Sequence, residues 1–97
     1  GFGDVETALS AVRRTAEAER LEADVVASSR RAFDISEERL REGTVDLVTV
    51  LNTQQTLSQA VDALAQARLA RLQAIVGLYQ ALGGGWLPKP VEAMNAR

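Results

Sequence analysis

The first forty residues repeat apolar side chains at alternating steps of four and three, as one face of a long helix does. Charged residues interrupt this stripe at three places. Its members are Val5, Leu9, Val12, Ala16, Glu19, Ala23, Val26, Arg30, Phe33, Glu37 and Leu40. The pattern predicts a helix over about residues 4–41, with Asp4 as its N-cap and Glu6 placed favourably in its first turn.

The same spacing returns in the second half of the chain and stops at a glycine triplet, residues 83–85. Its members are Leu47, Leu51, Gln54, Leu57, Val61, Leu64, Arg68, Leu72, Ile75, Leu78 or Tyr79, and Leu82. Because glycine is unfavourable inside a helix, the triplet predicts the end of a second helix, over about residues 46–82. At 1.5 Å per residue, each helix would be about 55 Å long.

A single glycine, Gly43, separates the two stripes in the sequence "LREGTVDLVTV". Glycine adopts the left-handed backbone conformation that ends a helix, and Thr44 or Asp46 can cap the helix that follows. A turn of three or four residues therefore reverses the chain at Gly43. The predicted fold class is all-α, a long antiparallel two-helix coiled-coil hairpin.

A strand is the alternative structure for residues 45–49. This segment is rich in β-branched residues, and Val45, Leu47 and Thr49 alternate along it. No other part of the chain reads as a strand that could pair with it, and a lone strand has no stable partner. The hairpin is therefore the preferred interpretation.

Charge is distributed unequally between the two predicted helices. Residues 1–42 hold seven Arg and ten Asp or Glu. Some of these are neighbours on one helix face, for example Glu37 with Arg41 and Arg13 with Glu17. The first helix is therefore expected to have a face in water.

The second helix carries few charges. The charged residues within 43–82 are only Asp46, Asp62, Arg68 and Arg71. Outward positions on this helix are expected to be small or neutral, namely Gln59, Ala60, Ala63, Ala67, Ala70 and Ala74. Small residues allow neighbouring helices to approach closely, so this helix is expected to pack on more than one side. One partner helix cannot cover it, so the isolated chain is predicted to form a homo-oligomer.

Composition excludes several kinds of function. The chain of 97 residues contains no Cys and no His, which removes the usual ligands of zinc and rules out thiol chemistry. A net charge of -2 argues against nucleic-acid binding, which normally needs a basic patch. Asp62 and Arg68 are too isolated to suggest acid-base catalysis. We expect no catalytic residues, no metal site and no cofactor. No apolar run reaches the length of a membrane span, so we expect a soluble segment.

Residues 43–86, "GTVDLVTVLNTQQTLSQAVDALAQARLARLQAIVGLYQALGGGW", resemble the end of TolC-like outer membrane efflux proteins, the exit ducts of tripartite pumps. Shared features are the glycine turn, the apolar "VL", a polar triplet (here residues 52–54) and the close "LYQALGGGW". Upstream, "GFGDVETALSAVRRTAEAERL" looks like the family's entry into the preceding long helix. The resemblance covers about residues 2–86. It implies a channel component and not an enzyme.

The resemblance also implies a location and partners. The parent protein would be a homotrimer in the outer membrane of a Gram-negative bacterium, and this segment would be the last periplasmic helical hairpin of each subunit. The turn would be the periplasmic tip that docks the adaptor (membrane fusion) protein and, through it, an inner-membrane pump. The docking residues that follow from this are Leu40, Gly43, Thr44, Val45 and Leu47.

The tip departs from the family pattern in three respects. Glu42 stands where a small or apolar residue usually precedes the glycine, and Leu40 stands where an aromatic residue is common. No basic residue follows the turn. The polar contacts that close the tip in some members therefore do not transfer, and Asp46 is left as a candidate acidic gate residue.

Residues 1–86 are expected to form the hairpin, with Trp86 as an anchor on other helices and residues 87–97 as a flexible tail. The alternative function is a structural one, an antiparallel coiled-coil module that dimerises and acts as a scaffold. The residues that precede this segment in the full gene would distinguish the two. A lipoprotein signal and amphipathic strands would support the channel.

Overall fold

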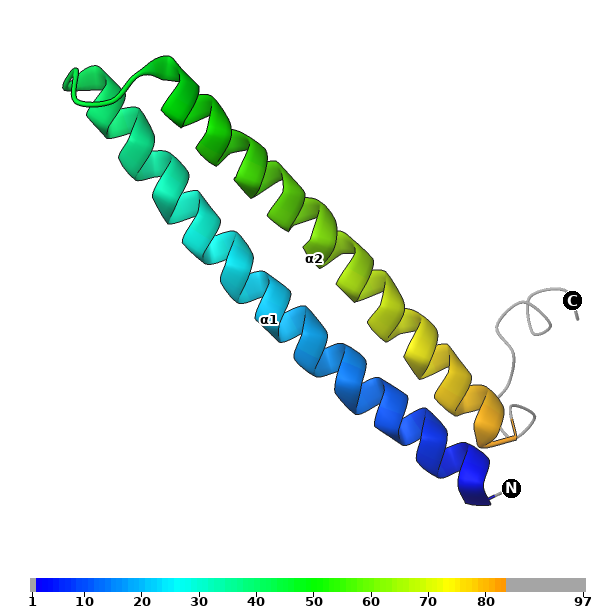
Figure 1. Ribbon diagram of the computed structural model, residues 1–97. Helices are drawn as coiled ribbons and strands as arrows, with labels where there is room; N and C mark the ends of the chain where they lie inside the picture. Colours follow the sequence, from blue (N-terminus) through cyan, green and yellow to red (C-terminus); the bar gives the residue numbers. More distant parts are fainter. Residues whose placement is uncertain (1, 84–97) are drawn as a thin grey trace, which may run out of the picture.

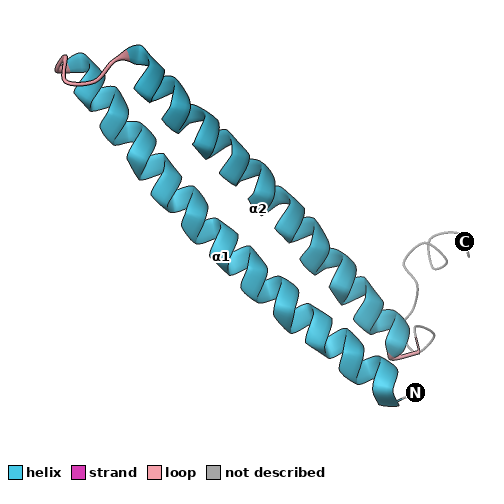
Figure 2. Cartoon of the chain, in the orientation of Figure 1, coloured by secondary structure: helices cyan, strands magenta, loops and turns pink. Residues whose placement is uncertain are grey.

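The structure, a computed structural model, describes residues 2–83 and consists of two long antiparallel helices (Figure 1). Helix α1 runs from Phe2 to Arg41 and α2 from Leu47 to Ala81. The start of α1 lies beside the end of α2, and a short loop joins the helices at the far end (Figures 1 and 2). The described residues contain no strand, so the all-α hairpin is confirmed and the strand alternative is wrong. Trp86 and residues 87–97 lie outside the described residues.

The helix ends differ slightly from the predicted ones. Asp4 does not cap α1, because the helix already begins at Phe2 and Asp4 lies inside its first turn. An acidic side chain there still favours the helix through its dipole. At the other end of the hairpin, α2 stops at Ala81, and Gly83 has a positive φ of 94°. Gly83, the glycine of "ALG", therefore ends the helix for the reason the sequence indicates.

The buried face of α1 is shifted by one position from the predicted stripe. Every seventh residue from Val5 faces α2 as expected. The other residues that face α2 each precede the predicted one by a single position in the sequence. Leu9 is 36% exposed, and Ala16, Ala23 and Arg30 are exposed. The residues that face α2 are Val5, Ala8, Val12, Thr15, Glu19, Glu22, Val26, Ser29, Phe33, Ser36 and Leu40. The inter-helix contact, here called the seam, is therefore more polar than the predicted stripe.

The buried face of α2 differs more. The predicted outward residue Ala60 is 5% exposed, whereas the predicted inward residues Leu47, Leu51 and Leu72 are at least half exposed. The seam on α2 consists of Val50, Thr53, Leu57, Ala60, Leu64, Ala67, Arg71, Ala74, Leu78 and Ala81. Alanine at alternate positions lets the two helices approach closely. Large apolar side chains are left on the outside of α2. The prediction that α2 packs on more than one side is therefore still supported, now by these exposed side chains and not by the small residues named for it.

The seam near the turn contains a pair of hydroxyl groups. Ser36 Oγ lies 2.7 Å from Thr53 Oγ1, and each hydroxyl also lies 2.8 Å from a carbonyl oxygen of its own helix, that of Phe33 or Val50. The two hydroxyl groups have two protons for these three contacts, so only two of the contacts can be hydrogen bonds at one time. In one arrangement both hydroxyls donate to the carbonyls of their own helices, and in the other one of them donates to the hydroxyl across the seam. Ser36 is 5% exposed. The pair satisfies polar groups that burial would otherwise penalise.

An ion pair crosses the seam closer to the open end. Arg71 Nε donates to Glu19 Oε2 at 2.5 Å, and both side chains are partly buried, with exposures of 34% and 23%. Glu19 interrupts the apolar repeat of α1, and Arg71 lies on the seam of α2 opposite it. The charge that breaks the pattern in one helix is therefore compensated by the other helix.

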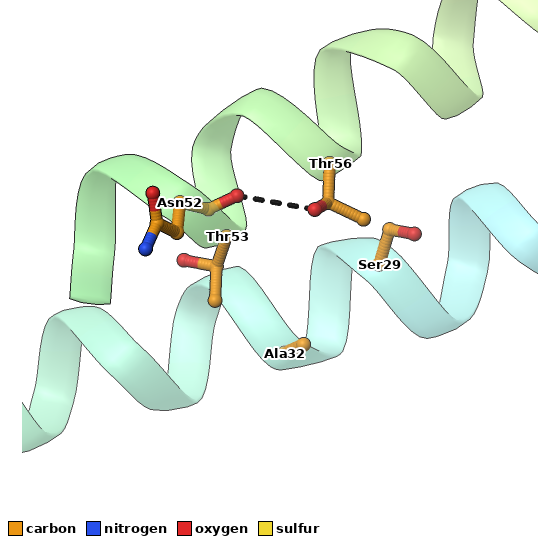
Figure 3. A pocket seen from close by; sticks show the side chains of 5 residues that line it. All are labelled: Ser29, Ala32, Asn52, Thr53 and Thr56. Atoms are coloured by element: carbon orange, nitrogen blue, oxygen red, sulfur yellow. Dashed lines mark hydrogen bonds between the residues drawn. The ribbon is translucent and has the colours of Figure 1, made fainter. Parts of the chain in front are cut away.

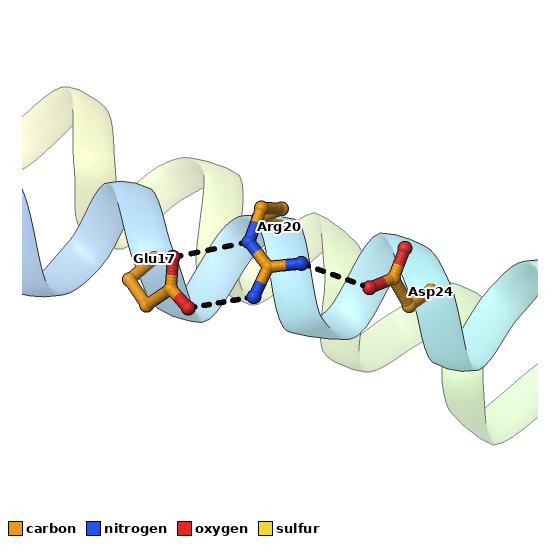
Figure 4. A network of polar contacts seen from close by, with 3 residues as sticks. All are labelled: Glu17, Arg20 and Asp24. Carbon is orange, nitrogen blue, oxygen red and sulfur yellow. Dashed lines mark hydrogen bonds and ion pairs between the residues drawn. The ribbon is translucent and has the colours of Figure 1, made fainter.

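Charged side chains on the outside of α1 form local networks. Arg20 bridges Glu17 and Asp24, with nitrogen to oxygen distances of 2.7 and 3.1 Å (Figure 4). The hydrogen bond from Arg20 holds the pKa of Glu17 below its ordinary value. Arg41 pairs with Glu38 at 2.6 Å. Each expected pairing has one wrong partner, since Glu17 pairs with Arg20 and not Arg13, and Arg41 pairs with Glu38 and not Glu37. The conclusion that this helix has a face in water is unaffected.

Neither helix, over its described length, has the extent and hydropathy needed to cross a membrane. Within residues 2–83 there is also no cluster of acidic side chains suited to holding a metal ion.

Candidate functional site

The turn between the helices is built on Gly43. Its φ is 79°, in the left-handed region, and its amide donates to the carbonyl of Leu40 at 3.0 Å. The next amide, that of Thr44, donates to the carbonyl of Arg39 at 2.9 Å, and the Thr44 hydroxyl donates to the same oxygen at 3.2 Å. These bonds form a Schellman motif, which satisfies the last carbonyls of α1. The predicted reversal of the chain at Gly43 is confirmed.

Substitution of Gly43 is expected to act through the backbone alone. A Cβ atom added there would meet nothing within 4 Å, yet the positive φ is unfavourable for any L-residue. Gly43→Ala should therefore lower the free energy of unfolding by about 1 kcal/mol. Gly77→Ala is the matched control, because Gly77 is helical and its Cβ position is also open; it should raise the free energy by up to about 1 kcal/mol. Urea titration of the two variants at one protein concentration measures both, and equal signs would contradict the assignment.

Asp46 is the N-cap of α2. Its backbone is extended, with φ -94° and ψ 171°, and its Oδ1 accepts hydrogen bonds from the amide of Thr49 at 3.0 Å and from the Thr49 hydroxyl at 2.9 Å. Of the two predicted capping residues, Asp46 is the one used, while Thr44 bonds back to α1. The amide of Thr49, and then its hydroxyl, hold the pKa of Asp46 below its ordinary value of 3.8.

The cap makes the stability of the hairpin depend on acid pH. A carboxylate with a lowered pKa stabilises the folded state above its ordinary pKa, and this contribution is lost as the pH falls through the lowered value. Asp46→Ala should therefore lower the thermal midpoint at pH 7, and the difference from wild type should shrink below about pH 4. Asp34→Ala is the control, because Asp34 lies inside α1 and caps nothing. A difference that stays constant from pH 7 to pH 2 would exclude the cap as its cause.

The five predicted docking residues lie together at the end of the hairpin, on the turn and the adjoining ends of the helices (Figure 1). Gly43 and Thr44 are exposed, Leu40 and Val45 are half-buried, and Leu47 is 57% exposed. Sequence reasoning missed the neighbouring residues Val48 and Leu51, which are 61% and 50% exposed. Their signal was the apolar "LV" and "VL" pairs just after the cap. The candidate site, here called the tip, is residues 40–47.

The apolar surface at the tip continues along α2. Nine large apolar side chains of this helix and its C-cap are exposed by 42% or more: Leu47, Val48, Leu51, Val61, Leu69, Leu72, Val76, Tyr79 and Leu82. In the seven-residue repeat, most of them occupy adjacent columns on one side of the seam. This surface, here called the apolar flank, is larger than soluble monomers usually leave uncovered.

The opposite side of the hairpin is polar and hollowed near the turn. Side chains from both helices line a hollow of about 150 Å³ (Figure 3): Ser29, Ala32, Asn52, Thr53 and Thr56. The Thr56 hydroxyl donates to the carbonyl of Asn52 at 3.1 Å, so it is satisfied within its own helix. The hollow contains no charged side chain, in contrast to the outside of α1.

Comparison with known proteins places these features in a family. Residues 2–84 match the family described as outer membrane efflux protein. The chain is 47% identical over 85 residues to the pyoverdine export outer membrane protein OpmQ of Pseudomonas aeruginosa, an alignment that covers 88% of the chain and 18% of the relative. The protein of the same name from Pseudomonas putida gives the same figures. The probable efflux pump outer membrane protein TtgC of Pseudomonas putida is 34% identical over 92 residues, 95% of the chain and 19% of the relative.

These alignments cover nearly all of the chain and a small part of each relative. The chain spans about a fifth of the length of the curated relatives it matches. No solved structure matches it. The matched range contains both helices, the glycine turn and the end of α2, which are the features on which the resemblance in the sequence depends. The chain therefore belongs to the outer membrane efflux protein family.

Proposed function

We propose that this hairpin is part of the periplasmic tunnel wall of an outer membrane efflux channel, and that its tip docks the periplasmic adaptor protein of a tripartite pump. The observation that carries the docking role is the cluster of exposed apolar side chains at the tip and just beyond it, where Leu47, Val48 and Leu51 are each at least half exposed. They flank an exposed glycine turn that leaves room for a partner to approach closely.

Outer membrane efflux proteins are transport channels, so the chain is part of a channel and not of an enzyme. Its relatives are outer membrane proteins of Pseudomonas, which agrees with an outer membrane and periplasmic location. In this role the hairpin conducts and docks, and it performs no chemistry. Small molecules are the proposed cargo, in line with the relatives named for export of pyoverdine and for efflux.

The rest of the hairpin fits a place inside a helical wall. The seam uses many small residues of α2, and the large side chains of the apolar flank are uncovered. Helix α2 therefore has apolar surface along its length that α1 does not bury. A wall of hairpins in a homotrimer would cover such a surface with neighbouring helices, whereas a single two-helix hairpin leaves it in water. The adaptor and an inner-membrane pump complete the proposed assembly.

The second proposed role concerns Asp46 as a gate residue. As the N-cap of α2, Asp46 already accepts two hydrogen bonds from Thr49. A gate contact would have to use its remaining acceptor capacity or break the cap. Charge substitutions at the tip of the full-length protein test the docking role.

A further inference from the structure

A column of side-chain amides runs along α2 between the apolar flank and the side of the seam that carries the hollow. Its members follow one another at steps of seven: Asn52, Gln59, Gln66, Gln73 and Gln80. All five are exposed. Residues that repeat every seven positions keep one orientation in a coiled-coil helix, so the amides form one line about 42 Å long, parallel to the hairpin.

The surroundings of this amide column on α2 carry one charge, that of Asp62, which lies between Gln59 and Gln66 in the neighbouring column. The adjacent column toward the seam contains Thr49, Thr56, Ala63, Ala70 and Gly77. The hollow near the turn includes Asn52, the first member of the amide column (Figure 3). Charged networks such as that of Glu17 and Arg20 lie on the outside of α1. The hairpin therefore has a charged surface, an apolar surface and a polar surface with few charges.

Each surface suits a different environment. The apolar flank needs cover from other helices. Amides packed against protein would each need partners, since an unsatisfied buried amide costs about 1–3 kcal/mol, so a line of five is suited to water. Bulk-facing helix surfaces usually carry many charged side chains, as the arginines and acidic residues on the outside of α1 do, whereas the amide column carries none. A neutral polar line is suited to a confined passage, because charges lining a narrow space focus the field and select ions by sign.

We propose that the amide column lines the water-filled duct of the channel and forms a line of uncharged hydrogen-bond donors and acceptors. This inference rests on the proposed function and specifies which surface of the hairpin faces the cargo. A wall of amides offers hydrogen bonds to polar cargo at every two turns of the helix and repels neither anions nor cations. The cargo class that it suits is polar small molecules.

The test introduces a charge after the channel has assembled. The described chain has no Cys, so Gln66→Cys and Gln59→Cys each add one thiol to this segment. The full-length channel is reconstituted in a planar bilayer, and a cationic methanethiosulfonate reagent is added while the reversal potential is recorded in a salt gradient. Modification should lower the ratio of cation to anion permeability by about twofold or more. Ala27→Cys, on the exposed outside of α1, and the unsubstituted channel are the controls and should not change.

Mass spectrometry of the recorded protein shows whether each thiol was modified. An unchanged reversal potential for both modified glutamine variants, or thiols at both positions that the reagent does not reach, would overturn the inference. A shift for Ala27→Cys as large as that for Gln66→Cys would overturn it as well. In all three cases the channel would still conduct, so the proposed function would stand. Absence of conduction in the unsubstituted full-length protein would instead count against the proposed function.

Discussion

A negative charge at Val45 or at Leu47 in the full-length channel is expected to reduce drug efflux strongly. Both residues belong to the tip, and Leu47 is 57% exposed at the first position of α2. A carboxylate placed in an apolar contact must be desolvated without a partner, which should weaken adaptor binding by about tenfold or more. An acidic residue in the first turn of a helix is favourable, so Leu47→Asp should leave α2 intact.

The experiment compares efflux in cells that carry each variant at normal expression. Val45 is half-buried, so its variant is checked for folding by circular dichroism of the purified chain, and Val45→Ile is the apolar control at the same position. Ala27→Asp places the same charge on the exposed outside of α1, far from the tip, and should leave efflux unchanged. Undiminished efflux for both Val45→Asp and Leu47→Asp would mean that the adaptor docks elsewhere.

The isolated chain is expected to be a dimer or a larger oligomer at micromolar concentration. Its apolar flank is too large to remain in water, and the simplest arrangement that covers it is a twofold four-helix bundle of two hairpins. Leu72→Glu, in the middle of the flank, should dissociate the assembly, because each copy would bury an unpaired carboxylate. Leu21→Glu is the matched control, since Leu21 is 50% exposed on α1 and Leu72 is 53% exposed on α2.

Light scattering and sedimentation velocity measure this state. A folded wild-type monomer at micromolar concentration would contradict the prediction, as would equal dissociation by the two glutamate variants. Antiparallel pairing of two α2 helices about Ala65 would place Asp62 opposite Arg68 of the second copy, since each lies three residues from Ala65. For that register, Arg68→Asp should weaken the dimer, and the double variant with Asp62→Arg should restore it.

Local features of the fold could be predicted from the sequence. Gly43 ends α1 and Asp46 caps α2 because glycine tolerates a positive φ and a carboxylate accepts from an exposed helix amide. The turn and the cap each depend on a few residues that are close in sequence, so the sequence alone is enough to predict them. The family could also be identified at this level, because the turn and the close "LYQALGGGW" stand in one continuous stretch.

The contacts across the seam could not be predicted in this way. Glu19 and Arg71 are 52 positions apart, and Ser36 and Thr53 are 17 apart. Each side chain alone reads as an interruption of an apolar pattern or as an ordinary helix residue. Only the antiparallel alignment set by the turn brings them opposite one another.

The sequence by itself determined two helices, their turn and their family, and the tertiary structure alone decided which face of each helix is inside. In α2 two overlapping patterns compete, one with Leu47, Leu51 and Leu72 inward and one with Ala60 and its repeats inward. Periodicity is a property of one helix, and both patterns satisfy it. The choice depends on how closely two helices can approach, and the alanine face of α2 against the serines of α1 allows the closer contact. The larger apolar side chains are then left outside, where only further helices can bury them.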